Sequence, residues 1–446
     1  MKIKKLISAA ISAVLMSSAL ISVTALALPE NIDNELYDGT FTYEMVNNTY
    51  TIIQCDSTAI IKEIPEYRNG YAVTAIGENA FVGCTMISEL KIPDTIKTIG
   101  DSAFAGCSSL KEVQLPSRLD KISAHLFMGC TSLQEIDIPD SVTTIESYAF
   151  YNCSKLASAK LPASLGVIHP MAFAECSSIA DIDASACGSY VFEDGFLYNK
   201  AKDIIVRASV ELSGDVYVPE GVKIIDAGAF SVCAAMENLF LPSSVTAIGE
   251  DAFGYCVSLK KVHFSEGLDS IRPVAFKNCY SLETLELPRT LQEIGEGAFY
   301  SCSKLNRVIF NDGIKTLGDG VFASCPELKE VTIPESITEI GDYALGFDVD
   351  SQGEYTPHEG FTLNVYAGSA GAKYASSNKI ATKKIGGNTV EVIFVVIVAA
   401  ILLAAAVLAF LLMRKGKKGA SAAVKKADKA AAKKAEEENY KKILDD

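Results

Sequence analysis

The chain has 446 residues, 49% of them hydrophobic, and a formal net charge of −15. Length alone favours two or three domains. The leader carries three lysines, and the tail from Arg414 carries 11 basic and 6 acidic residues, which leaves −23 on the part between them. Such an acidic exterior disfavours nucleic acid and anionic lipid headgroups as partners. Basic proteins, cationic ligands and neutral sugars fit it better.

Residues 1–27 have the three parts of an export signal. Lys2, Lys4 and Lys5 form a basic start, an apolar run covers residues 6–23, and Ala25-Leu26-Ala27 is a small-x-small cleavage site. We expect cleavage before Leu28, the alternative being a signal anchor that is never cut.

Residues 28–72 predict an N-terminal β cap. Apolar and polar residues alternate over residues 43–64 around the turn pair Asn47-Asn48. A stack of repeats needs such a cap because its first coil would otherwise expose core.

Residues 73–184 and 221–346 are built from one phrase that recurs every 23 residues, which overrides the domain count expected from length. A fixed period of this size indicates stacked coils, each burying its apolar face against its neighbours in a continuous core. The apolar residue at the same place in each coil is Phe81, Phe104, Phe127, Phe150 and Phe173 in the first group, then Phe230, Phe253, Phe276, Phe299, Phe322 and Leu345.

Residues 99–116 show the phrase in full, Ile-Gly-x-x-Ala-Phe-x-x-Cys-x-x-Leu-x-x-Val-x-Leu-Pro. Leu-x-x-Val-x-Leu is typical of a short half-buried strand, which Pro116 ends because proline cannot donate to a ladder. The apolar spacing of three and four before it predicts a helical turn. Each coil is then one strand and one short helix, and parallel pairing of successive strands gives an α/β solenoid.

This phrase resembles the leucine-rich repeats of the Bacteroides surface protein A (BspA-like) family over residues 73–345. The resemblance implies a right-handed horseshoe or arc, a surface location and roles in adhesion or ligand binding, and it implies no enzyme activity.

Residues 185–220 interrupt the period, since Cys176 and Cys233 are separated by one repeat plus 34 extra residues. Asp194-Gly195 between apolar runs predicts a β-hairpin. We favour an irregular coil within one arc; a hinge or a protruding binding lobe is the alternative.

Ten of the twelve cysteines recur at the repeat period. Their side chains should lie side by side along the solenoid, whereas a disulfide needs a specific facing geometry. We therefore expect buried thiols that act as small apolar fillers, with isolated bridges most plausible at the off-register Cys55 or Cys187. No CxxC, HExxH, Gly-x-Ser-x-Gly or Walker A motif is present, which disfavours a structural zinc site and an enzyme.

Residues 347–380 predict a loop and a C-terminal cap, with a closing strand from Phe361 and a short helix over residues 369–378. Within the loop, Asp348, Asp350, Gln352 and Glu359 have the spacing of an EF-hand calcium loop. Gln352 is a poor ligand there and no helical pattern flanks the loop, so a polar surface loop without cofactor is the simpler interpretation.

Residues 381–391 form a linker, and residues 392–413 form an uncharged apolar run, long enough to span a bilayer as one helix. Arg414 and the lysines after it then place the Lys/Ala-rich tail, residues 414–446, in the cytoplasm and the repeats outside. The expected location is a bacterial cell surface, in a single-pass membrane protein.

The residues on either side of each strand's central residue should face outward, on the concave side of the arc. In the second group of coils they combine aromatic and charged side chains and predict a ligand-binding patch of Asn238, Phe240, Lys261, His263, Glu286, Arg307 and Ile309. Isolated exposed apolar residues are also ordinary. The function expected is a non-catalytic, membrane-anchored extracellular binding or adhesion protein that recognises protein or glycan. The alternative is a structural or assembly subunit of the cell envelope.

Overall fold

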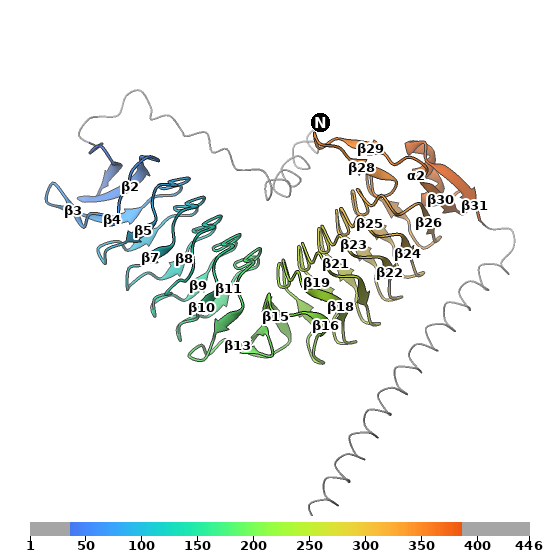
Figure 1. Cartoon of the computed structure of the whole chain (residues 1–446), viewed down its shortest axis with the longest axis horizontal. Helices are drawn as coiled ribbons and strands as arrows, with labels where there is room; N and C mark the ends of the chain where they lie inside the picture. The colour runs from blue at the N-terminus through green and yellow to red at the C-terminus, as the bar shows by residue number, and fades with distance from the viewer. Residues whose placement is uncertain (1–35, 386–446) are drawn as a thin grey trace, which may run out of the picture. The chain divides into compact units, whose positions relative to one another are not determined.

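The computed structural model describes residues 36–385, which form a solenoid of stacked coils (Figure 1). The expected signal peptide, the apolar run at 392–413 and the tail lie outside the described residues. Among the residues described, no helix is both long and apolar enough to cross a membrane.

The chain enters the solenoid through the predicted β cap. Strands β1 (Phe41–Val46) and β2 (Thr49–Cys55) form an antiparallel hairpin, with Asn47 and Asn48 at positive φ in its two-residue turn. Strand β4 (Tyr71–Ile76) pairs with β2 in parallel and, through its other edge, with β6 (Thr98–Ile99); β3 (Tyr67–Arg68) pairs antiparallel with β4. The cap thus ends in the parallel direction that the coils continue.

Each coil contributes up to two short strands, and these form two parallel ladders. The first ladder, which carries the Leu-x-x-Val-x-Leu segments, consists of β5 (Glu89–Lys91), β7 (Glu112–Gln114), β10 (Ser158–Lys160), β12 (Asp181–Asp183), β16 (Gly214–Tyr217), β18 (Met236–Phe240), β20 (Lys261–His263), β22 (Thr284–Glu286), β24 (Arg307–Ile309) and β26 (Glu330–Ile333). The second ladder consists of β6, β8 (Lys121–Ile122), β9 (Thr144–Ile145), β11 (Val167–Ile168), β17 (Ile224–Ile225), β19 (Ala247–Ile248), β21 (Ser270–Ile271), β23 (Glu293–Ile294), β25 (Thr316–Leu317) and β27 (Glu339–Ile340).

The expected helix in each coil is wrong. In the coil of Phe104, the residues two before and two after it, Ser102 and Gly106, have positive φ, which a right-handed helix does not allow. The Phe104 N–H donates to the Leu126 carbonyl of the next coil (3.0 Å) rather than within its own turn. These turn segments therefore bond coil to coil, and the solenoid has little helix.

The phenylalanines form columns, as expected. The core, however, is divided, whereas the repeat period predicted a continuous core. The rings of Phe276 and Phe299 stack with centroids 5.2 Å apart, and Phe299 and Phe322 follow at 5.4 Å. The buried residues divide into one cluster within residues 41–197 and another within residues 196–375. We call the coils of residues 73–184 the first stack and those of residues 221–346 the second stack.

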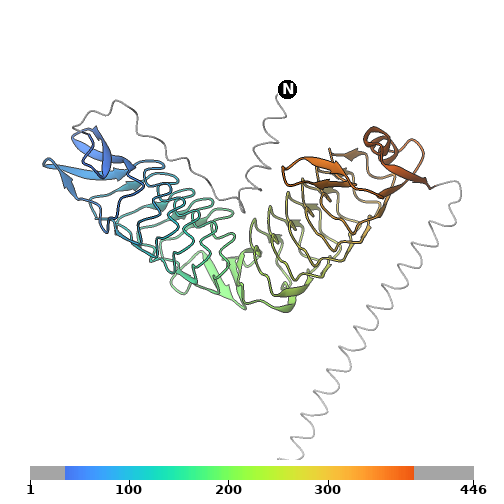
Figure 2. The ribbon, with the colours of Figure 1, turned by 45° about the horizontal axis from the view of Figure 1, so that its top comes forward.

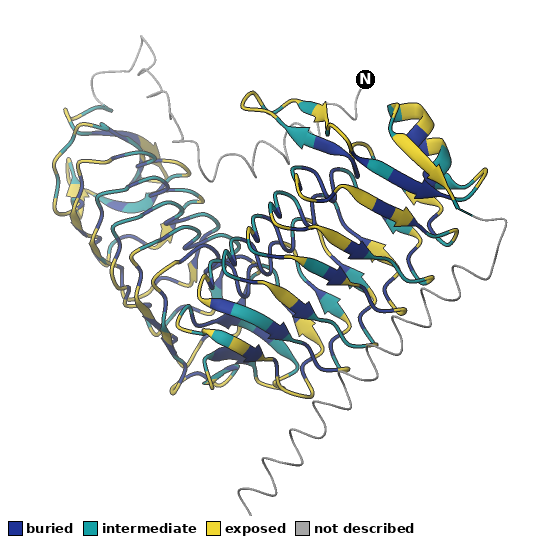
Figure 3. Cartoon of the chain, turned by 45° about the vertical axis from the view of Figure 1, so that its right-hand side comes forward, coloured by how far each residue is buried: buried dark blue, intermediate teal, exposed yellow. Residues whose placement is uncertain are grey.

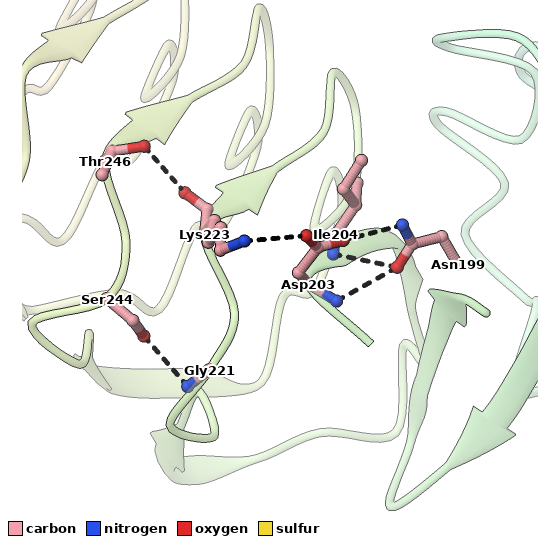
Figure 4. Close-up of polar contacts among 7 residues, drawn as sticks. All are labelled: Asn199, Asp203, Ile204, Gly221, Lys223, Ser244 and Thr246. Atoms are coloured by element: carbon pink, nitrogen blue, oxygen red, sulfur yellow. Dashed lines mark hydrogen bonds and ion pairs between the residues drawn. The ribbon is translucent and has the colours of Figure 1, made fainter. Parts of the chain in front are cut away.

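The insert begins the second ladder of the second stack. Strands β13 (Tyr190–Glu193) and β14 (Phe196–Asn199) form the predicted hairpin, and β15 (Ile204–Ala208) joins β14 to β17. Asn199 accepts the N–H groups of Asp203 and Ile204, and Asp203 is paired with Lys223 of the next coil at 3.2 Å (Figure 4). The hairpin is therefore part of the stack rather than a protruding lobe.

A buried arginine of the insert joins the two stacks, which meet at an angle around β13 and β15 (Figures 1 and 2). Arg207 is 2% exposed. Its guanidinium donates to the carbonyl of Cys176 in the first stack (3.2 Å) and to those of Gly228 and Ser231 in the second (3.0 Å each). Such a cation is retained in a core only because carbonyl oxygens satisfy it.

The C-terminal cap has the predicted strand and helix. Strand β30 (Thr362–Val365) pairs in parallel with β26, and helix α2 (Ala370–Asn378) is N-capped by Ser369, whose Oγ accepts the Ala372 N–H. Strand β31 (Ala381–Lys384) extends this sheet within the segment expected to be a linker.

Candidate ligand-binding face

The predicted patch residues lie on adjacent strands of the first ladder in the second stack. Their central residues, among them Leu239, Val262 and Leu285, are buried, so the residues on either side point outward. Figure 3 shows this alternation of exposed and buried residues along the strands. Register pairing then arranges the outward side chains in two rows across the strands.

One row is aromatic. The rings of Tyr217, Phe240 and His263 are stacked, with centroids 4.4 Å and 4.2 Å apart and planes within 9° and 5° of parallel. Tyr217 is 52% exposed, whereas Phe240 and His263 are half-buried. Burial, and then the nearby charge of Lys261, lower the pKa of His263 below its usual value, so this ring is neutral at pH 7. The row continues with Glu286 and Ile309.

The other row is polar and changes sign along the ladder. Asp215 accepts a hydrogen bond from the Asn238 amide (2.7 Å) on the neighbouring strand. Lys261, Thr284 and Arg307 follow in register, and the two cations are exposed. The face therefore offers hydrogen-bonding and charged groups beside a flat apolar ridge.

The structure brings together all seven patch residues predicted from sequence, and it adds Tyr217 and Asp215, which the sequence reasoning missed. Both belong to the segment read as an irregular insert. The signal that could have found them is Val216-x-Val218-Pro219, which repeats the strand ending Leu239-x-Leu241-Pro242.

Turn segments of the two stacks also contact each other directly. Glu175, two residues after Phe173, is paired with Lys277 of the second stack, and its backbone N–H donates to Ser231 Oγ (2.9 Å). The inner side of the bend is therefore lined by turns. The predicted position of the patch on the concave side is wrong, since the patch strands lie on a different side of the coils.

The proposed calcium ligands do not converge. Asp348 Oδ2 is 2.7 Å from Nδ1 of His358, and Asp350 Oδ1 accepts the backbone N–H groups of Gln352 and Glu354. These bonds fix the hairpin of β28 (Phe347–Val349) and β29 (Tyr355–Pro357), and Glu359 is exposed beyond it. In residues 36–385, no group of three or more His, Cys, Asp or Glu side chains is placed to hold a metal ion.

The periodic cysteines are buried free thiols that donate hydrogen bonds. The Sγ of Cys279 donates to the carbonyl of Phe253 at 3.3 Å, one coil back, and Cys302 does the same to Phe276. Burial raises the pKa of Cys130 and of Cys325 to about 12. The thiols of Cys130 and Cys325 are therefore structural groups rather than nucleophiles, since the reactive form is the thiolate.

Comparison with known proteins agrees with this architecture. Residues 73–202 and 223–348 match the BspA type leucine-rich repeat region, and the chain belongs to this family. A leucine-rich cell-surface protein from Faecalibacterium prausnitzii is 25% identical, with a TM-score of 0.53, over 69% of this chain and 94% of that one. A leucine-rich repeat protein from Eubacterium ventriosum has the same fold, with 22% identity and a TM-score of 0.51, over 69% of this chain and 92% of its own. No curated protein matches the chain.

Proposed function

We propose that this chain is a non-catalytic cell-surface protein that binds an extracellular protein or glycan through the first-ladder face of its second stack. The observation that carries the proposal is the pair of rows on that face, one aromatic and one polar. Aromatic and arginine side chains dominate the energetics of recognition surfaces. The location is proposed from the resemblance to the cell-surface protein of F. prausnitzii.

The backbone under this face favours recognition. Strands β16 to β24 are held in one parallel sheet, so the outward side chains have fixed spacing before a ligand arrives. A binding surface that is already ordered pays little conformational entropy on association.

The test is capture of partners by the purified full chain from protein and glycan arrays, followed by affinity measurements with variants. Phe240→Ala and Arg307→Ala should each weaken binding about 10-fold or more if they are central contacts. Tyr280→Ala and Arg289→Ala are matched controls, since both residues are exposed and lie off this face. Unchanged affinity in both patch variants would remove the face from the function.

Membrane anchoring is part of the proposal and rests on the apolar run at 392–413 and the basic residues after it. The full chain should stay with membranes in alkaline carbonate, and a chain ending at residue 385 should be released. Release of both forms would leave a surface protein held in another way.

A structural or assembly role in the cell envelope is the second candidate. The N-terminal cap exposes a set of large apolar side chains, namely Met45, Val46, Ile53, Ile60, Tyr67 and Tyr71. Exposed apolar groups of this kind favour lateral packing against another protein. Crosslinking on intact cells that captures only envelope proteins of the same cell would favour this role.

A further inference from the structure

The first ladder is divided into several sheets, and one of the divisions, which we call the break, lies at the insert. Strand β12 pairs with β10 and belongs to the first stack, whereas β16 pairs with β18 and begins the next sheet. Just before the break the two sides touch, since Val210 N–H donates to Ile179 (3.3 Å) and Ser209 Oγ donates to Ala180 (2.8 Å). Beyond these contacts, β12 and β16 are not paired with each other.

This break leaves one aromatic ring face uncovered. Phe240 covers one side of the Tyr217 ring at 4.4 Å, and His263 supports Phe240 in turn. Because β16 is the last strand of its sheet, no ring of the described residues stacks on the other side of Tyr217, which is 52% exposed. The stack behind it holds that ring in one orientation.

The charges beside the break are mostly negative. Asp215 lies on the same face of β16 as Tyr217, and Glu211 and Glu220 flank the strand; all three are exposed. Across the break, β12 carries Asp181 and Asp183; Lys160 lies in register with Asp183, whereas Asp181 lies opposite the uncharged Ser158. A neutral sugar gains little from such a charge density, whereas a cation gains both long-range attraction and ion pairs.

We infer that the ring face of Tyr217 at this break binds an arginine side chain of a partner protein, stacked on the ring and paired with the carboxylates beside it. A planar guanidinium combines stacking on an aromatic face with bidentate bonds to carboxylate, which a lysine ammonium does not. The inference names a partner for the proposed function and rests on it. It adds a contact at one end of the patch, separate from Phe240 and Arg307 as ligand contacts.

The experiment uses the purified full chain and three fluorescent peptides of the same sequence, in which two positions are arginine, lysine or citrulline. The arginine peptide should bind most tightly, the lysine peptide less, and the neutral citrulline peptide least. Binding should weaken as salt is raised, because exposed charges are screened. Cellohexaose serves as the neutral sugar probe.

Tyr217→Ala should weaken the arginine peptide roughly 2- to 5-fold, the range of an exposed cation–π contact. Asp215→Asn should weaken it similarly and reduce the salt dependence. Tyr217→Phe should retain binding because it keeps the ring. Tyr280→Ala is the control, and an unchanged melting temperature excludes unfolding as the cause.

Three outcomes would overturn the inference. Equal affinity for the arginine and citrulline peptides would show that the positive charge of the side chain is not recognised. Salt-insensitive binding of cellohexaose that Tyr217→Ala abolishes would make the ring a sugar site. A partner whose affinity falls with Phe240→Ala and Arg307→Ala but not with Tyr217→Ala would leave the proposed function standing without this contact.

Discussion

Lys277 of the second stack lies with its Nζ 3.5 Å from Glu175 Oε1 of the first stack, and both side chains are almost wholly buried. The same ammonium is 3.1 Å from Asp251 Oδ2 and sits over the Tyr255 ring at 5.3 Å. We call Glu175, Asp251 and Lys277 the junction cluster. Its single cation serves two carboxylates and spans the division between the two cores.

Removing that cation should destabilise the protein strongly. Lys277→Met leaves the carboxylates of Glu175 and Asp251 buried without their cation, and breaking a buried pair in this way costs about 3–5 kcal/mol. Lys260→Met is the matched control, because Lys260 also pairs with a carboxylate, Glu237 at 2.7 Å, but both side chains are half-exposed. Such a surface pair contributes little to stability, because water screens its exposed charges. Urea unfolding of both variants measures the difference, and similar losses would contradict the role of the cluster.

Stability should depend on pH through Asp251. Burial raises the pKa of this carboxyl to about 7, from 3.8 in the unfolded chain. Between these values the folded protein holds a proton that the unfolded chain releases, so the contribution of Asp251 to stability falls as pH rises from 4 to 7. The carboxyls of Glu175 and Glu250, the hydroxyls of Tyr148 and Tyr151 and the ammonium of Lys277 surround it. Relative to Asp251→Asn, the unfolding midpoint of the unaltered chain should decline over this range, and a constant difference would refute the assignment.

The pKa of His263 should respond to its neighbours on the proposed ligand-binding face. Burial, and after it the charge of Lys261, lower this pKa, whereas Glu286 and Asp215 act in the opposite direction. Lys261→Met should therefore raise this pKa and Glu286→Gln should lower it, as followed by NMR of the imidazole. Lys260→Met, one residue away, should change it least. Because the folded pKa is depressed, His263 reduces stability as pH falls below the unfolded value of 6.5.

The thiols should be inert until the protein unfolds. All twelve cysteines are buried and unpaired. Native protein at pH 8 should therefore incorporate no maleimide within the time in which urea-unfolded protein labels at every cysteine, as counted by mass spectrometry. If the urea-unfolded protein incorporates two maleimides fewer than its number of cysteines, it contains a disulfide. Cys55 and Cys84 are the first pair to examine, because their side chains interact directly.

The sequence predicted what the period controls. The positions that Phe276 and Leu285 occupy recur in every repeat. The phenylalanine columns, the strand segments and the outward direction of Lys261 could therefore be predicted from the repeat alignment. The turn was misread because a spacing of three and four is shared by a helix and by a turn with left-handed residues at Ser102 and Gly106. That choice depends on backbone φ, which apolar spacing does not report.

The contacts between the two stacks could not be predicted, because the insert does not follow the 23-residue period. Glu175 and Lys277 meet only because β13 to β15 set how the second stack follows the first. Arg207 reads as an ordinary strand residue until the carbonyls around it are known. Tyr217 was not predicted to belong to the patch for the same reason, since its strand follows an aperiodic segment.

The division into two stacks sets which changes of length the molecule tolerates. A deletion of one 23-residue unit between Phe299 and Leu345 would remove one step of an arm and rejoin equivalent turns. A deletion of the unit around Phe276 would take Lys277 with it and put Tyr300 at its place beside Asp251 and Glu175. We therefore expect repeat duplication and loss to be tolerated in the part of the second stack after Phe299. The units that carry the junction cluster should keep their number and order.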